Sequence, residues 1–578
     1  MAVPKAALSL TLSSGAVFTA SLSIQVLGVI ASYFLYHHIG VSDAGSALLG
    51  TVQLFLLIGS SINGVGDLRL GTAYTYFLAR GKPATDNTAT YLLWRMLMVG
   101  LVGIIIFVVA PLSVSGYRLV TGNLEWTSLG VFLALPVLWS FSTVYNQMFI
   151  GQGNSLKAQY PSLVEALARL PVLIWVAYYD PTIEGLTLAY VVGATASTLF
   201  AMPAILRQAR RFRRLEVVHL FRFAWPLMGS LILNYLVTNM VPFLVTFRAG
   251  TAALNAFLLA NGFRILVLSL PAAVTTPLFP YIAGLHKQEE YERVRRSTWQ
   301  ALRYTSMLLV PGVVALVTYR TNFILVFGGH HYVASASLPL AILVIGAIPL
   351  ALSQVMLSSI DAIGYQRLEL YITSAQVLVL FGSAALLFSL FPLSTALIAA
   401  SVAVLLSSCA AIVLNTYFLE RLLAVRIHGR SVIGITLGAA LAFGVISRFN
   451  KPGFLFGLPR PGFLPGFTTP GYLPVTTGYE LAGVIVLCFT VYFFVLAAIG
   501  ELTRQDVLLI GRSIGFPVSW CRTIAAMCWR ETSPDLAPAL PGQAIGLRQP
   551  ELPETFTGTK EFPDIGEPLP PAPPEEKP

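Results

Sequence analysis

The stretch PVLWSFSTVYNQMFIGQGNSLKAQY at 136–160 has a counterpart in PLALSQVMLSSIDAIGYQRLELY at 349–371. The two align at a constant offset of 213 residues, counted from Pro136 to Pro349. In each copy an apolar run ends in an Ile-Gly pair and a polar turn, and a second apolar run follows. Chance similarity of two Leu-rich stretches is one explanation. The other is a membrane protein built from two related helical bundles.

The composition of the whole chain shows why apolar runs dominate it. Of its 578 residues, 56% are hydrophobic and only 11% are charged, against roughly 25% charged in an ordinary soluble protein. The mean hydropathy is +0.75. So little polar surface cannot cover the core of a soluble enzyme of this length, and it excludes a disordered scaffold or a secreted disulfide module. We therefore expect an all-α polytopic membrane protein.

Fourteen apolar runs are long enough to cross a bilayer, since each crossing needs about 20 mostly apolar residues. The predicted spans are 9–36, 46–78, 89–110, 128–150, 158–178, 185–206, 222–247, 254–283, 299–319, 334–360, 368–390, 394–418, 431–447 and 479–500. Glycines in the second span and prolines in the eighth predict bends there. Because six spans separate the repeat copies, both have one orientation. This predicts two six-helix bundles related by a pseudo-two-fold axis along the membrane normal, followed by two extra helices.

The pattern predicts five regions along the chain. They are an N-terminal bundle at 1–206, a basic linker at 207–220, a C-terminal bundle at 221–418, two extra helices with a Pro/Gly/Phe-rich loop at 419–500, and a tail at 501–578 that is disordered from about residue 532. Basic residues gather in every second loop, which places those loops and both termini in the cytoplasm by the positive-inside rule. The net charge of +10 therefore reflects topology, and nucleic acid is not an expected partner.

Three segments of the second half carry a recognisable pattern. They are FRFAWPLMGSLILNYLVTNMVPFLV from 221, LNAFLLANGFRILVLSLPAAVTTPLFPYIAGLHKQ from 254 and FILVFGGHHYVASASLPLAILVIGAIPLALSQVMLSSIDAIGYQRLELYITSA from 323. The pattern resembles the polysaccharide transporter branch of the MATE-like (multidrug/oligosaccharidyl-lipid/polysaccharide) flippase superfamily. That branch has prolines near the start of its seventh helix and late in its eighth, and Gly-containing turns on either side of its tenth. The matching residues are Pro226, Pro280, Phe327 with Gly328 and Tyr332, and Gly364 with Arg367.

The resemblance implies two bundles around a cavity that opens alternately to each side, with transport and no catalysis. Such proteins move polyisoprenyl-(pyro)phosphate-linked oligosaccharides from the cytoplasmic to the outer leaflet of the prokaryotic plasma membrane. The implied partners are a lipid-linked glycan, membrane lipids and polysaccharide assembly enzymes, around a monomeric transport unit. The alternatives are a lipid II flippase, which also has fourteen helices, and an ion-coupled multidrug exporter, which typically has twelve. A membrane glycosyltransferase is a weaker alternative, because the loops hold few acids.

Charged and polar residues inside the spans are the candidate site residues. A phosphate-bearing sugar headgroup needs cations and hydroxyl or amide groups, and charge within a membrane span is costly. Arg69, in the Gly-rich stretch INGVGDLRLG, and Arg264, with Asn261 one turn earlier, are the expected phosphate contacts. A polar stripe in the seventh span is expected to bond the sugar, and its residues are Asn234, Tyr235, Thr238 and Asn239. More arginines than acids in this set disfavour an exporter of cations.

Several of these charges also allow a purely structural explanation. Asp67 lies two residues from Arg69 and is able to pair with it, while Glu165 and Arg169 are four apart and predict an ion pair within one helix. Asp67 and Glu165 are also candidates for coupling transport to a proton, sodium or the membrane potential, with no cofactor. Arginines near the predicted cytoplasmic ends of spans are expected to extend to the membrane surface. These are Arg95, Arg222 and Arg303. The adjacent His330 and His331 lack carboxylate support, so no metal site is expected.

Overall fold

The computed structural model describes residues 5–79, 84–109, 123–152, 154–209 and 214–423, together with short helical pieces between 435 and 496. Every regular element in these ranges is a helix, which confirms the all-α class. Ten described segments are long and apolar enough to cross a bilayer, so the chain is a multi-pass membrane protein. The predicted Pro/Gly/Phe-rich loop and the tail lie outside the described residues, as does most of the last predicted helix pair.

The described helices form two successive series. The first half contains α1 (Lys5–His38), α2 (Asp43–Val65), α3 (Leu70–Ala79), α4 (Ala84–Val109), α5 (Asn123–Gly151), α6 (Ser155–Ala158), α7 (Tyr160–Tyr179) and α8 (Ile183–Gln208). The second half contains α9 (Arg214–Lys287), α10 (Tyr291–Thr318), α11 (Arg320–Gly328), α12 (His330–Ala362), α13 (Gln366–Leu390), a 3-10 turn (Leu393–Thr395) and α14 (Ala396–Leu423). The short α6 and α11 are not among the predicted elements, because they are too short to produce an apolar run of membrane length.

The offset of 213 residues recurs in the bounds of the helices. Adding it to Ile183, the first residue of α8, gives Ala396, the first residue of α14. Adding it to Gly151, the last residue of α5, gives a position two residues beyond Ala362, where α12 ends. The end of α5 and the start of α8 therefore recur within two residues at the end of α12 and the start of α14. These two bounds agree with the predicted repeat.

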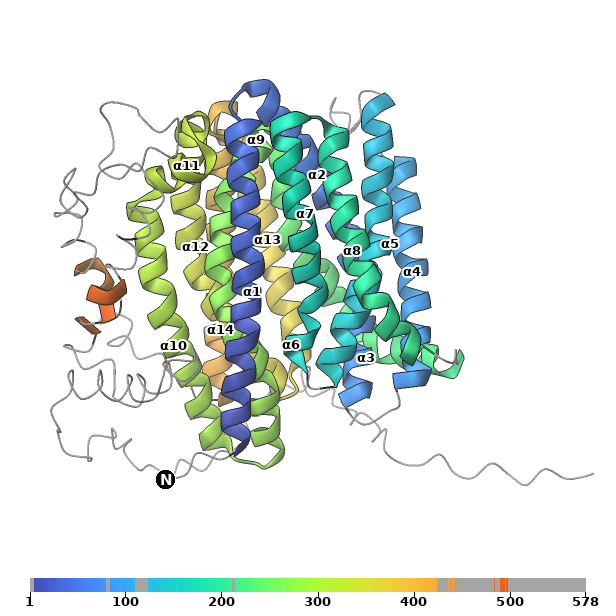
Figure 1. Ribbon diagram of the computed structural model, residues 1–578. Helices are drawn as coiled ribbons and strands as arrows, with labels where there is room; N and C mark the ends of the chain where they lie inside the picture. The colour runs from blue at the N-terminus through green and yellow to red at the C-terminus, as the bar shows by residue number, and fades with distance from the viewer. Residues whose placement is uncertain are drawn as a thin grey trace, which may run out of the picture.

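The helices lie alongside one another between two ends of the bundle (Figure 1). We call one of these the basic end, because Arg207, Arg293 and Arg296 lie there, where α8 and α12 finish and α10 begins. It is the lower end in Figure 1. At the opposite end α2 begins and α11 is placed (Figure 1).

Contacts between the halves close the opposite end. The Nδ2 of Asn255 in α9 donates to the Ser46 hydroxyl of α2 at 3.4 Å, and the Tyr36 hydroxyl of α1 donates to the Asn255 carbonyl at 3.4 Å. Within the second half, the same Nδ2 donates to the Tyr332 hydroxyl of α12 at 2.8 Å. The Tyr36 and Tyr332 rings meet edge to face at 5.2 Å. Gly50 of α2 packs so closely on the backbone carbonyl of Thr251 that a Cβ has no room. Because these polar groups are buried, each needs a hydrogen-bond partner, and Tyr36 and Ser46 bring theirs from the first half.

The two predicted bends have different outcomes. The span at 46–78 is interrupted, since α2 ends at Val65 and α3 begins at Leu70. Within 254–283 the backbone of α9 stays helical through its prolines, and the non-helical residue in α9 is Gly250, with φ of 84°. Gly250 divides α9 into two consecutive spans. A positive φ is readily available to glycine, so the turn between these spans needs no longer loop.

Candidate functional site

The break between α2 and α3 places several charged groups beside the boundary of the two halves. Leu68 and Arg69 adopt φ of 47° and 58°, a left-handed conformation that is uncommon for bulky residues. The Oδ2 of Asp67 accepts from the Gly71 N–H at 3.2 Å at the start of α3, which satisfies one of the free donors of that helix. Strained backbone of this kind persists only where surrounding contacts hold it in place.

Asp67 is the centre of a buried network within the first half. Its Oδ1 accepts from the Tyr91 hydroxyl at 2.6 Å and forms an ion pair with Arg95 of α4. Arg95 also donates from Nη2 to Asn63, to the carbonyl at 3.1 Å and to Oδ1 at 2.6 Å. The Arg95 side chain is only 1% exposed, so the prediction that it extends to the membrane surface is wrong. Burial without an acid would be too costly for this guanidinium, and Asp67 supplies that acid.

Arg69 pairs across the two halves and not with its neighbour in sequence. Its Nη2 lies 3.2 Å from Oε1 of Glu369, in the first turn of α13, and the two side chains are 27% and 12% exposed. The predicted pairing of Arg69 with Asp67 is therefore wrong, because Asp67 is occupied by Arg95. Asp361, in the last turn of α12, interacts electrostatically with both members of the pair. Its Oδ1 is buried and has no hydrogen-bond partner in the described structure.

Sequence reasoning missed Glu369 and Asp361. Both lie at the ends of predicted spans, where a charged residue normally reaches water and is therefore not a candidate site residue. The signal that was available is the repeat turn at 361–369, which contains two acids next to an otherwise basic loop.

Tyr235 is the member of the predicted polar stripe that lies at the boundary of the halves. It packs against Gly64 of α2, where an added Cβ would overlap its hydroxyl and ring, and it interacts electrostatically with Asp67, Arg69 and Arg95. The remaining residues of the stripe are less enclosed: Asn234 and Thr238 are exposed and Asn239 is half-buried. The structure thus brings one of the four predicted sugar contacts to the charged network.

Arg264 lies apart from this network. Its Nη1 donates to Asn261 Oδ1 at 3.1 Å, which confirms the predicted proximity of the two. Its Nε is buried without a partner, and no acidic side chain in the described part of the chain pairs with it. Arg264 and Asn255 are nine residues apart, two and a half turns at about 3.6 residues per turn, so they lie on opposite faces of α9. Arg264 therefore faces away from the contacts that Asn255 makes with the first half.

Glu165 and Arg169 form the ion pair predicted within α7. Their Oε1 and Nη1 atoms are 3.6 Å apart. The Trp139 indole donates to the same Glu165 oxygen at 3.2 Å, and the Arg169 guanidinium lies 5.0 Å from the centre of the Tyr190 ring. These contacts lie entirely in the first half and account for both charges.

Of the other two arginines predicted to reach the membrane surface, Arg303 lies 5.6 Å from the Trp299 ring centre, and the Arg222 side chain lies outside the described residues.

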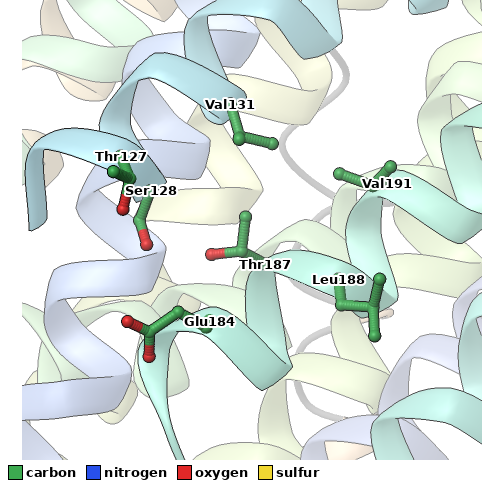
Figure 2. Close-up of a pocket in the computed structure, with 7 residues that line it drawn as sticks. All are labelled: Thr127, Ser128, Val131, Glu184, Thr187, Leu188 and Val191. Carbon is green, nitrogen blue, oxygen red and sulfur yellow. The ribbon is translucent and has the colours of Figure 1, made fainter. Parts of the chain in front are cut away.

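A pocket of about 230 Å³ lies between α5 and α8 in the first half. Figure 2 shows hydroxyl groups of Ser128 and Thr187 at the gap, apolar side chains such as Val131 beside it, and Glu184 at its edge. None of the predicted site residues lines this pocket. The charged network at the α2–α3 break, and not this pocket, is therefore the candidate functional site.

Comparisons with known proteins agree with this architecture. Residues 74–337 match the family described as polysaccharide biosynthesis protein, while no curated protein sequence matches the chain. The fold is similar to that of the lipid II flippase MurJ in an inward closed conformation, with a TM-score of 0.64 and 13% identity over 84% of this chain and 98% of that one.

Two transporters with lower TM-scores show the same fold. A MATE transporter from Vibrio cholerae, VcmN, gives a TM-score of 0.52 with 17% identity over 71% of this chain and 97% of its own. A MOP superfamily transporter from Pyrococcus furiosus gives 0.54 with 13% identity over 72% and 95%. At these identities the likeness concerns the fold alone.

Proposed function

We propose that the chain is a member of the MATE-like (multidrug/oligosaccharidyl-lipid/polysaccharide) flippase superfamily and that it flips a polyisoprenyl-(pyro)phosphate-linked oligosaccharide. The family match over residues 74–337 and the similarity of fold support this proposal. The direction proposed is from the cytoplasmic to the outer leaflet of a prokaryotic plasma membrane. The polar headgroup passes between the two halves while the lipid tail stays in the bilayer, and the halves open alternately to the two sides. No bond is made or broken, so the protein is a transporter and not an enzyme.

The observation that carries this proposal is the share of this chain that superposes on each known structure. The lipid II flippase matches 84% of this chain, whereas two MATE transporters match 71% and 72%. In all three cases the match includes 95% or more of the known structure. The flippase fold thus accounts for a longer part of this chain than the multidrug fold does. The polysaccharide family match over residues 74–337 supports a glycan as the cargo.

The ratio of arginines to acids does not distinguish a glycan flippase from a cation exporter, although the sequence suggested that it would. Arg69 and Arg95 face Asp67, Glu369 and Asp361 in one network, so arginines do not outnumber acids at the boundary. An exporter of amphiphilic cations therefore has to be separated from a glycan flippase by the choice of substrate in an assay.

A vesicle assay tests the proposal directly. The purified protein is placed in liposomes whose inner leaflet carries a fluorescent polyisoprenyl-pyrophosphate oligosaccharide, and an impermeant quencher reports its arrival in the outer leaflet. We expect protein-dependent transport that Arg69→Ala slows by about tenfold, equivalent to about 1.4 kcal/mol. The matched control is Arg293→Ala, since Arg293 is an exposed arginine at the same basic end. Transport of a cationic dye or of lipid II, with none of the oligosaccharide, would reject the proposal in favour of that alternative.

Orientation is part of the proposal and has its own test. The positive-inside rule favours a cytoplasmic basic end, since Arg207, Arg293 and Arg296 lie there. The test uses two single substitutions at exposed positions, Glu292→Cys at the basic end and Val41→Cys at the opposite end. An impermeant maleimide added to intact cells should label the cysteine at 41 and spare that at 292. The reverse pattern would place the basic end outside.

The proposal also includes the source of energy that drives transport. Asp67 is the residue put forward for coupling to a proton, sodium or the membrane potential, and no cofactor is invoked. Glu165, the other candidate from the sequence, is engaged by Arg169 and Trp139 and is not put forward for this role. The transport unit is proposed to be a single chain that works beside polysaccharide assembly enzymes.

A further inference from the structure

The Arg69–Glu369 ion pair joins the two halves near the basic end of the bundle. Glu369 lies in the first turn of α13, which starts at that end, and Arg69 immediately precedes α3. The other described ion pair between the halves joins His331 to Asp43 at the opposite end, with Asp43 98% exposed. Exposed pairs contribute little to stability. The Arg69–Glu369 pair is partly buried, so it is the stronger of the two connections.

The Arg69 guanidinium has donors that this pair does not use. An arginine offers five N–H donors, yet only Nη2 of Arg69 has a hydrogen bond in the described structure, and its buried Nε has none. At 27% exposure the side chain remains accessible. Arg95 differs, because it is 1% exposed and both of its Nη atoms are bonded. Of the two arginines in this network, Arg69 is the one able to accept an additional anion.

The backbone on either side of Arg69 is fixed by contacts that do not involve the Arg69 side chain. Asp67 is held by Arg95 and Tyr91, and the Leu70 N–H donates to the Asp67 carbonyl at 2.8 Å. The left-handed residues of the turn thus lie between fixed points. A change of partner at Arg69 therefore needs only a rotation of the side chain.

A second carboxylate lies within electrostatic reach of the Arg69–Glu369 pair. Asp361 interacts with both Arg69 and Glu369, its Oδ1 has no partner among the described residues, and it lies in the last turn of α12. The C-terminus of α12 carries a partial negative charge, so Glu369 and Asp361 repel each other more strongly when the Arg69 guanidinium is absent. This repulsion favours the return of Arg69 to Glu369 once a competing anion has gone.

Resting on the function proposed above, we propose that Arg69 exchanges Glu369 for the phosphate of the substrate. Phosphate accepts two parallel hydrogen bonds from a guanidinium as a carboxylate does, so the two anions compete for the same donors. When phosphate binds, the ion pair between the halves is lost and the basic end is released to open. When phosphate leaves, Glu369 pairs with Arg69 again and the basic end closes.

Spin labels across the basic end test this exchange without any transport measurement. Cysteines replace Gln152 in the first half and Glu292 in the second, both on exposed positions, in a background with the four native cysteines replaced. Pulsed dipolar spectroscopy in lipid nanodiscs then gives the populations of short and long distances. The probes are polyisoprenyl pyrophosphate without sugar and inorganic pyrophosphate, which separate a lipid ligand from a free anion.

We expect the probe to raise the long-to-short population ratio of the wild type by about tenfold, within the usual range of coupling between sites. Glu369→Gln should show the raised ratio without probe. The exchange Arg69→Glu with Glu369→Arg should restore the short distance in the absence of probe, because it rebuilds the ion pair with its charges reversed. Arg293→Gln is the control and should behave as the wild type.

Three results would overturn the exchange: no response of the wild type to either probe, a wild-type distribution in Glu369→Gln, or a raised ratio without probe in the charge-exchanged protein. A response only to inorganic pyrophosphate would also overturn it, because the ligand proposed is lipid-linked. The probe carries no sugar, so failure of oligosaccharide transport in the vesicle assay leaves these results unaffected. Conversely, transport with an unresponsive ion pair refutes the exchange alone.

Discussion

Removing Asp67 should destabilise the protein more than removing any exposed charge does. Asp67→Ala leaves the Arg95 guanidinium, 1% exposed, without an acid, and it also takes away the acceptor of the Tyr91 hydroxyl. Breaking a buried ion pair by removing one partner costs about 3–5 kcal/mol. Arg293→Ala, which removes an exposed charge, should cost less than about 0.5 kcal/mol.

The measurement is the free energy of unfolding in mixed micelles, from titration with SDS and tryptophan fluorescence. A double-mutant cycle with Asp67→Ala, Arg95→Met and the combined variant isolates the interaction between the two residues. The combined variant should be more stable than Asp67→Ala alone, because the unpaired buried charge is gone.

Equal effects of Asp67→Ala and Arg293→Ala would refute the reasoning, since they would mean that Arg95 reaches water when its acid is lost. A double mutant no more stable than Asp67→Ala would also refute it, because the cost would then come from the turn itself.

Three further variants probe other parts of the boundary. Gly64→Ala should cost about 1–3 kcal/mol of stability through overlap with the Tyr235 ring, and Tyr235→Ala should relieve it; a neutral Gly64→Ala would contradict the close packing. Asn255→Leu should cost about 1–3 kcal/mol by leaving the buried Tyr332 hydroxyl without its donor, as unfolding titrations can show, and an unchanged midpoint would speak against this contact. Glu165→Gln should lower stability and leave the pH dependence of transport intact, because the carboxylate is already engaged within α7; loss of that pH dependence would instead assign Glu165 to coupling.

The course of the helices was largely predictable because membrane spans are local features. Each requires an apolar run of fixed length, and the bounds of α5, α8, α12 and α14 follow the predicted runs closely. The repeat was readable for the same reason, since the offset of 213 residues preserves the Ile-Gly pair that ends each copy's first apolar run. The interruption of the second span also followed from its glycines, which weaken a helix wherever they cluster.

The partners of the charged residues were not predictable in the same way. Sequence distance favoured Asp67 for Arg69, but the structure gives Asp67 to Arg95, 28 residues away, and Arg69 to Glu369, 300 residues away. Glu165 and Arg169 were predicted correctly because both lie on one helix, where a spacing of four residues fixes their distance.

The sequence by itself determined the class, the spans, the repeat and the resemblance to a flippase superfamily, because these depend on local hydrophobicity and on the order of motifs. Only the tertiary structure decided which arginine is enclosed, which is accessible and which lies on the far face of α9. The physical reason is that a charge in a membrane protein takes the partner that packing brings within reach, and packing joins helices that are far apart in the chain. The boundary between the halves, where Arg69 meets Glu369, exists only after both bundles have assembled.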